Sequence, residues 1–156
     1  MFKIIYFWIN SKVKRMQKIE HIGIAVKDIE KSALLFSSLF GEPAYKTEVV
    51  ESEGVRTSFF KTGPNKIELL EATRPDSPIA KFLEKKGEGI HHIAFAVEDI
   101  EKKVKELKNE GFRILNEIPK KGADNKLVVF LHPKSTNGVL IELCQDNKNF
   151  LKPTIP

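Results

Sequence analysis

Hydrophobic and polar positions along the chain form one pattern that occurs twice. Residues 19–32, IEHIGIAVKDIEKS, align without a gap on residues 90–103, IHHIAFAVEDIEKK. In each segment apolar residues alternate with small or polar ones, which predicts a strand. Helical spacing of apolar residues follows directly. An internal repeat of this kind predicts two equivalent modules in one chain.

Helix boundaries are marked at equivalent places in the two copies. Asp28 and Asp99 precede the helical segments, where an aspartate side chain can accept hydrogen bonds from free backbone N–H groups. Gly41 and Gly111 stand where the helices are expected to end. The pattern therefore predicts that each first strand leads into one capped helix.

Further strands are expected after each helix. Strand-like runs cover residues 55–62 and 66–72 in the first copy and residues 126–132 and 138–144 in the second, with turn residues at 63–65 and 135–138. The pattern thus predicts one strand, one helix and three further strands in each module. A short helix is expected at 79–85 in the linker. We predict an α+β fold with a single domain at 17–146, made of modules 18–72 and 90–145, a leader at 1–16 and a tail at 147–156.

Each predicted first strand carries a histidine at the same position, His21 and His92. Side chains alternate between the faces of a strand. His21 therefore shares its face with Gly23 and Ala25, and His92 shares its face with Ala94 and another alanine. We expect the bulky opposite face to pack on the helix, with His91 on that face at its exposed edge. The small residues leave room beside each repeated histidine.

A glutamate repeats on the last strands. KIELL at 66–70 matches LIELC at 140–144, which aligns Glu68 with Glu142. Both acids stand between large apolar residues and should be buried, and a buried carboxylate is costly unless it is paired or binds a metal. No lysine or arginine lies beside Glu142 in its run, and two imidazoles with two carboxylates suit Co²⁺, Ni²⁺, Zn²⁺ or Mn²⁺. The sequence predicts a divalent metal site, and it does not select one of these ions.

Charge and composition exclude some classes of function. The chain has a formal net charge of +5, but Lys3, Lys12, Lys14 and Arg15 in the leader account for most of it. The remaining near-neutral chain offers no basic stripe for a nucleic acid. The apolar part of the leader is too short for a membrane span or a signal peptide, and Met16 directly precedes the patterned chain, so the leader is expected to be a mis-assigned start or a disordered extension. The single cysteine, Cys144, fits a reducing cytoplasm.

Four segments resemble the vicinal oxygen chelate (glyoxalase-fold) superfamily and, within it, the methylmalonyl-coenzyme A epimerase family. They are HIGIAVKDI, KIELLEAT, SPIAKFLEKKGEGIHHIAFAVEDI and FLHPKSTNGVLIELC, and the resemblance covers about residues 18–144. It implies paired βαβββ modules around a divalent metal, with His21, Glu68, His92 and Glu142 as ligands. Co²⁺ is the ion that we expect at this site. It also implies a homodimer.

The activity implied by the resemblance is 1,1-proton transfer at the α-carbon of methylmalonyl-coenzyme A. Glu142 is the expected acid/base. Some family members have a glutamine in place of Glu68, and some carry a second glutamate where this chain has Thr57, which cannot act as a base. Glu48, Glu51 and Glu53 lie nearby in sequence. The residues expected to contact the coenzyme A portion of the substrate are Lys120, Lys126, His132, Lys134 and Ser135, and Lys121 also lies in this loop.

Two main alternatives remain from the sequence. A glyoxalase I-type lyase acting on a glutathione hemithioacetal would use the same kinds of ligand, although the linker and the loop resemble the epimerases. A metal-free ligand-binding protein of the same fold would have no need of two buried acids. A ring-cleaving dioxygenase is a weaker third option, because it would use two histidines and one acid on iron.

Overall fold

The computed structural model describes residues 15–148. The predicted leader and tail fall outside the described residues, apart from two residues of each. The division into leader, domain and tail therefore remains a prediction.

The described part of the chain contains the two modules that the repeat predicts. The first consists of β1 (Lys18–Ala25), α1 (Ile29–Phe40), β2 (Lys46–Val50), the short 3₁₀ helix η1 (Glu51–Glu53), β3 (Val55–Thr62) and β4 (Asn65–Ala72). The second consists of β5 (Gly89–Ala96), α3 (Ile100–Asn109), β6 (Lys120–Lys121), β7 (Lys126–Leu131), the 3₁₀ helix η2 (Pro133–Ser135) and β8 (Ile141–Asp146). The predicted linker helix is α2 (Pro78–Lys86). The α+β prediction is confirmed.

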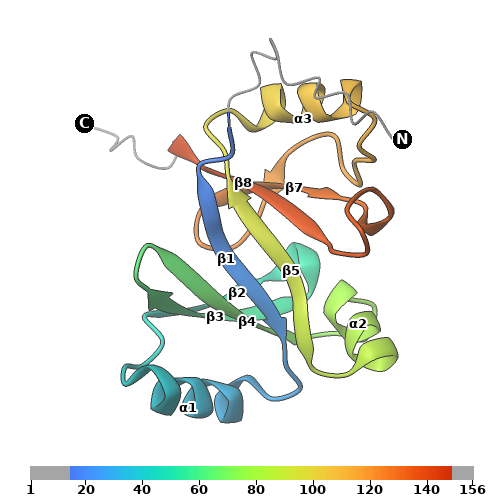
Figure 1. The fold of residues 1–156 in the computed structure, drawn as a ribbon. Helices are drawn as coiled ribbons and strands as arrows, with labels where there is room; N and C mark the ends of the chain where they lie inside the picture. Colours follow the sequence, from blue (N-terminus) through green and yellow to red (C-terminus); the bar gives the residue numbers. More distant parts are fainter. Residues whose placement is uncertain (1–14, 149–156) are drawn as a thin grey trace, which may run out of the picture.

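The two modules share one curved sheet with the strand order β2-β3-β4-β1-β5-β8-β7-β6. β1 and β5 pair antiparallel at its centre, where each lies beside the last strand of its own module in a parallel pairing. In Figure 1 these two strands run side by side through the middle of the molecule, with α1 at the outer end of the first module and α3 at that of the second. The first strands of the repeat therefore meet at the interface between the modules.

Both predicted N-terminal helix caps are present. The side chain of Asp28 accepts a hydrogen bond from the backbone N–H of Lys31, and Asp99 accepts one from Lys102, each at 3.0 Å. Gly41 ends α1 in the left-handed conformation, with a φ of 74°. The caps fix where each strand turns into its helix.

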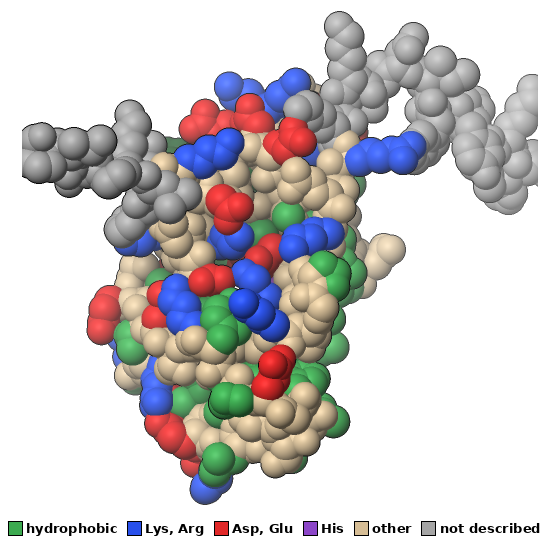
Figure 2. Space-filling model, turned by 90° about the vertical axis from the view of Figure 1, so that its left-hand side faces the viewer, with side chains coloured by type: hydrophobic (Ala, Val, Ile, Leu, Met, Phe, Trp, Pro, Cys, Tyr) green, Lys and Arg blue, Asp and Glu red, His purple; other side chains and the backbone are tan. Residues whose placement is uncertain are grey.

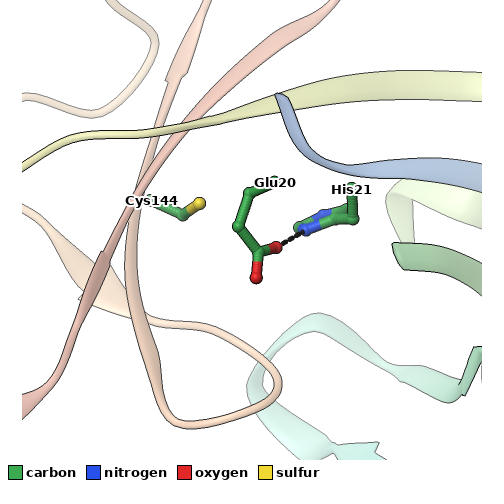
Figure 3. A group of neighbouring side chains, drawn as sticks. All are labelled: Glu20, His21 and Cys144. Atoms are coloured by element: carbon green, nitrogen blue, oxygen red, sulfur yellow. Dashed lines mark hydrogen bonds and ion pairs between the residues drawn. The ribbon is translucent and has the colours of Figure 1, made fainter. Parts of the chain in front are cut away.

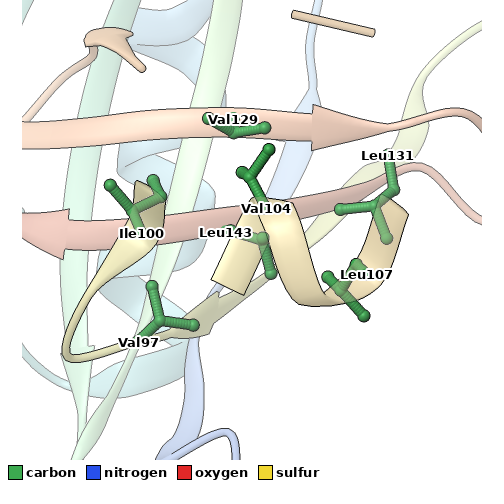
Figure 4. Packing of buried hydrophobic residues seen from close by; sticks show 7 residues of the cluster. All are labelled: Val97, Ile100, Val104, Leu107, Val129, Leu131 and Leu143. Carbon is green, nitrogen blue, oxygen red and sulfur yellow. The ribbon is translucent and has the colours of Figure 1, made fainter. Parts of the chain in front are cut away.

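The helix-facing sides of the strands form the core. Figure 4 shows one such cluster, in which side chains of α3 contact strands β7 and β8. The first module has an equivalent cluster between α1, β1, β3 and β4. The residues of the second-module cluster are Val97, Ile100, Val104, Leu107, Val129, Leu131 and Leu143. Packing of the bulky strand faces on the helices, as expected, leaves the other face of the sheet free for a site.

Charged side chains of both signs are interspersed on the face shown in Figure 2, without a continuous basic stripe on that face. Within residues 15–148, no helix is both long enough and apolar enough to cross a membrane.

The central pairing of β1 with β5 is interrupted once in each strand. Ile19 pairs with Phe95 and His21 with Ala94, which leaves Glu20 as an extra residue. Gly23 pairs with His92 and Ile24 with Ile90, which leaves His91 as an extra residue. Such bulges change the direction of a side chain. Each repeated histidine is thus preceded by a bulged residue.

Candidate metal centre

The register of the central strands brings the two predicted histidines together. His92 on β5 pairs with Gly23 on β1, and His21 on β1 pairs with Ala94 on β5. Residues that pair across strands point to the same face of the sheet. The Nε2 atoms of the two histidines lie 2.9 Å apart, although 71 residues separate them in the sequence. The small residues therefore lie opposite the histidines and leave space for both rings.

The predicted glutamates reach the same place from the neighbouring strands. Glu68 on β4 pairs with Gly23, and Glu142 on β8 pairs with Ala94. All four side chains are buried, with Glu68 at 4% and Glu142 at 5% of their full exposure. Gly23 and Ala94 thus each pair with a histidine on one neighbouring strand and with a glutamate on the other.

Distances among the four groups suit one cation. Oε2 of Glu68 lies 3.3 Å from Nε2 of His21 and 3.5 Å from Nε2 of His92. The Glu142 oxygens lie 3.8 Å and 3.5 Å from the same two nitrogens. First-row cations bind such ligands at about 2.0–2.2 Å, which places neighbouring ligand atoms roughly 3–3.5 Å apart. The donor set and its spacing therefore fit a divalent metal.

Electrostatics of the centre also favour a bound cation. Burial alone would lower the pKa of His21, but the charge of Glu68 and the hydrogen bond with Glu20 outweigh it and raise the pKa to about 10. Burial raises the pKa of Glu142 to about 8; His21 opposes this shift and Glu68 adds to it. Burial lowers the pKa of His92 well below its usual value. The raised pKa of His21 reflects the negative charge of the carboxylates around it, which a bound cation would neutralise.

Two other groups of potential ligands have different explanations. Cys144 lies near Glu20 and His21 (Figure 3), but burial raises the pKa of its thiol far above the usual value and its Sγ donates to a backbone carbonyl at 3.5 Å. It is a packed core residue. The second group, Asp28, Glu30 and Glu71, caps the start of α1 and pairs with Arg56.

The bulges place two further polar side chains at the centre. Oε2 of Glu20 lies 2.5 Å from Nδ1 of His21, and Nδ1 of His91 lies 3.0 Å from Nδ1 of His92. The expectation that His91 lies at an exposed edge of the bulky face is wrong, because the bulge turns its ring toward His92 and the pocket. Strict alternation along the strands hid both contacts.

A cavity of about 300 Å³ extends from the four side chains of the centre. Thr57 lines it with a hydroxyl that is buried and has no hydrogen-bond partner among the described residues. Lys120 and Lys126 also line it. The cavity therefore combines the centre with an unpartnered hydroxyl and two cationic side chains.

The other predicted substrate contacts lie outside the cavity lining. His132 Nδ1 accepts from the backbone N–H of Lys134, and Oγ of Ser135 accepts from that of Arg113 at 2.9 Å. These bonds fix the turn at η2. The structure therefore groups Lys120 and Lys126 with the centre and does not group His132, Lys134 and Ser135 with it.

Of the three glutamates near Thr57 in sequence, the structure brings Glu53 to the cavity. Lys120 Nζ pairs with Glu53 at 2.6 Å. Glu48 accepts from the backbone N–H of Asp124 and pairs with Lys46 at 3.1 Å, and Glu51 is exposed in η1. The carboxylates of the centre itself are thus those of Glu68 and Glu142.

Replacing Gly23 with alanine is expected to abolish tight metal binding. An added Cβ would lie 2.2 Å from Cε1 of His92, so the imidazole would have to move. Metal content of Gly23→Ala, purified without chelators, should fall far below that of the native protein. The matched control is Ala94→Gly, at the equivalent position of the second module, which removes atoms and should keep its metal. A full metal complement in Gly23→Ala would contradict the role of Gly23.

Comparisons with known proteins agree with this architecture. The family model described as the Glyoxalase/Bleomycin resistance protein/Dioxygenase superfamily matches residues 20–130. The chain is 40% identical over 138 residues to human mitochondrial methylmalonyl-CoA epimerase, covering 88% of this chain and 78% of that protein. It is 42% identical over 130 residues to an ethylmalonyl-CoA/methylmalonyl-CoA epimerase of Cereibacter sphaeroides, covering 82% of this chain and 97% of that protein.

A solved structure shows the same fold. It is that of a methylmalonyl-CoA epimerase variant of Streptomyces coelicolor in complex with 2-nitronate-propionyl-CoA, with a TM-score of 0.80 and 36% identity, covering 85% of this chain and 96% of that one. A chain with epimerase relatives thus has the internal repeat, the central pairing of β1 with β5, and the buried histidines and glutamates. The chain belongs to the glyoxalase/bleomycin resistance protein/dioxygenase superfamily, within which the relatives given above are methylmalonyl-CoA epimerases.

Proposed function

We propose that the protein is a methylmalonyl-CoA epimerase that interconverts the (R) and (S) forms of its substrate. The observation that carries the proposal is the meeting of His21, Glu68, His92 and Glu142 at one cavity, in a chain whose relatives bear that name. The substrate carries its acidic α-proton between a thioester carbonyl and a free carboxylate. These two oxygen donors suit a centre that binds a cation.

Glu142 is the acid/base in this proposal. One of its oxygens takes the α-proton, the C–H bond breaks, and the electron pair moves into the thioester carbonyl to give an enolate. A solvent water then delivers a proton to the opposite face of the α-carbon, which produces the other epimer, and the proton taken by Glu142 passes to the solvent, which restores the carboxylate. A positioned base of this kind contributes roughly 10²–10⁴-fold to the rate. Glu142 is 5% exposed and lines the cavity that would receive the acyl group.

The same four side chains would hold the divalent ion. When bound, the cation supplies stabilisation of the negative charge that develops on the substrate oxygens, worth several kcal/mol. We propose Co²⁺ as the native ion, with Ni²⁺, Zn²⁺ or Mn²⁺ as alternatives that suit the same nitrogen and oxygen donors. Measuring metal in protein purified without chelators identifies it.

Lys120 and Lys126 are the proposed contacts to the coenzyme A portion, since both line the cavity that opens from the centre. The cavity volume of about 300 Å³ suits the acyl end of the thioester, and the phosphate-bearing arm would extend over its rim. His132, Lys134 and Ser135 lie outside the lining and remain predicted contacts for that arm.

We propose that the hydroxyl group of Thr57 donates a hydrogen bond to the bound substrate. It is 1% exposed and its Oγ1 has no partner among the described residues. Thr57→Val keeps the shape of the side chain, so kcat/KM should fall by about 10-fold or more, as for the loss of a hydrogen bond to a charged group. The free energy of unfolding should stay the same or rise, because an unsatisfied buried hydroxyl is removed.

The matched control for Thr57→Val is Thr47→Val on β2. Oγ1 of Thr47 lies 3.1 Å from Oγ of Ser58, and Thr47 does not line the cavity. This variant should lose stability and keep kcat/KM. Steady-state kinetics and thermal unfolding of both variants check the pair. Unchanged kcat/KM in Thr57→Val would exclude a substrate contact.

The alternative enzyme, a glyoxalase I-type lyase, is separated by its substrate. Proton NMR in deuterated water should show loss of the α-proton signal of methylmalonyl-CoA with metal-loaded protein, and no turnover of a glutathione hemithioacetal. The reverse result would assign the lyase activity. A metal-free binding protein would show neither reaction, and it would leave two buried carboxylates beside the histidines without a purpose.

The assembly and the location of the protein remain predictions. A homodimer and a cytoplasmic location are proposed, on the resemblance and on the single buried cysteine respectively. Light scattering of the purified protein measures the first.

A further inference from the structure

Glu20 is a buried carboxylate that neither the four ligands nor the proposed proton transfer uses. It is 2% exposed, and its Oε2 lies 2.5 Å from Nδ1 of His21. A carboxylate removed from water is costly unless positive or donor groups surround it. Its position directly behind a proposed metal ligand therefore suggests a role at the centre.

Two lysines hold this carboxylate on its other side. Oε1 of Glu20 forms an ion pair with Lys66 Nζ, and Lys126 Nζ lies 3.5 Å from the same oxygen. Lys66 is also bound to Asp124 at 2.7 Å and Lys126 to Asp146 at 2.5 Å. Because the lysines stabilise the ionised form, Glu20 acts as an acceptor and Nδ1 of His21 as the donor.

The bulge in β1 explains how a residue adjacent to His21 reaches its ring. Glu20 is the residue without a partner in the pairing of β1 with β5. In a regular strand it would point to the opposite face from His21. Figure 3 shows the carboxylate turned toward the imidazole, with the hydrogen bond between them.

The second module has the same bulge with a different side chain. His91 is the extra residue of β5, and its ring lies 3.0 Å from Nδ1 of His92. Burial lowers the pKa of His91 to about 4, so it has no charge near neutral pH. The two metal-facing histidines thus have unequal supports: a carboxylate held by lysines behind His21, and a second imidazole behind His92.

We propose that Glu20 is a positioning residue for the metal centre: it fixes His21 with its proton on Nδ1 and its free Nε2 directed at the cation. Carboxylates in this position orient the ring and make it a better ligand, and removing them typically weakens metal binding by about 10–100-fold. The inference rests on the metal centre of the proposed function and does not depend on the identity of the substrate.

Metal binding alone tests the proposal. Isothermal titration calorimetry of Zn²⁺ with the full-length protein, stripped of metal by a chelator and then desalted, measures the Kd. This Kd should be about 10–100-fold larger for Glu20→Gln than for the native protein. Glu20→Asp, which keeps the carboxylate, should recover part of the loss. Long-range ¹H–¹⁵N NMR of the Zn²⁺-loaded native protein should show His21 with a proton on Nδ1, and the downfield shift of that proton should be lost in Glu20→Gln.

The matched control removes a glutamate charge beside another buried lysine. Glu106→Gln removes the carboxylate that lies 3.1 Å from the ammonium of Lys103 on α3, a helix that carries none of the four proposed ligands. Its Kd for Zn²⁺ should not change. Equal Kd values for the native protein and Glu20→Gln, with the His21 proton unshifted, would overturn the proposal and leave Glu20 a purely structural residue.

Discussion

Glu142→Gln is expected to reduce α-proton exchange of methylmalonyl-CoA by about 10²–10⁴-fold, the contribution of a positioned base. The glutamine keeps an oxygen that can face the cation, but it cannot accept the proton. Proton NMR in deuterated water measures the exchange, with metal content determined on the same samples so that a loss of metal is not mistaken for a loss of the base.

The equivalent residue of the other module provides the matched control for Glu142→Gln. Glu68→Gln changes the same kind of side chain at the corresponding position of β4, where the resemblance implies that a glutamine also serves as a ligand. We expect this variant to retain most of its exchange rate once it is saturated with metal. Equal losses in the two variants would show that Glu142 acts only as a ligand, and would contradict its assignment as the base.

Removing the metal is expected to have the second-largest effect, on stability as well as on activity. Glu68 and Glu142 are buried beside two histidines. Among the described residues, neither carboxylate forms an ion pair with a lysine or arginine. A cation that binds the folded state alone stabilises it by about 4 kcal/mol at a free concentration of 1,000 times its Kd. Thermal unfolding with and without metal should therefore show a clear upward shift of the melting temperature.

A pair of histidine variants checks the origin of that shift. His92→Ala removes a proposed ligand and should abolish the response of the melting temperature to metal. His132→Ala removes a histidine that lies outside the cavity lining and should leave the response intact. A melting temperature of the native protein that does not respond to any of the four candidate ions would contradict the metal centre.

The repeat made the four proposed ligands predictable. Each ligand position is defined by local features: a histidine followed by small residues on one strand face, or a glutamate between large apolar residues. Pseudo-symmetry then supplied the long-range information, because two equivalent modules must bring equivalent residues to their shared interface. The N-caps Asp28 and Asp99 were predictable for the same reason, since capping depends on neighbours three residues away.

The support around the ligands was not predictable from the sequence. Whether Glu20 and His91 point into the site depends on bulges in the pairing of β1 with β5, two strands that are distant in the chain. Regular alternation assigned His91 to the wrong face. Likewise, the contact of Lys66 with Asp124 joins β4 to a loop 58 residues away, and the unpartnered state of the Thr57 hydroxyl becomes evident only when every neighbour is in place.

One measurement tests the central claim most directly: the rate of α-proton exchange of methylmalonyl-CoA, followed by NMR in deuterated water as Co²⁺ is titrated into metal-free protein. We predict negligible exchange without metal, a linear rise with added ion, and a break at one ion per chain. Exchange that is independent of metal, or no exchange once a tightly bound ion is present, would contradict the account.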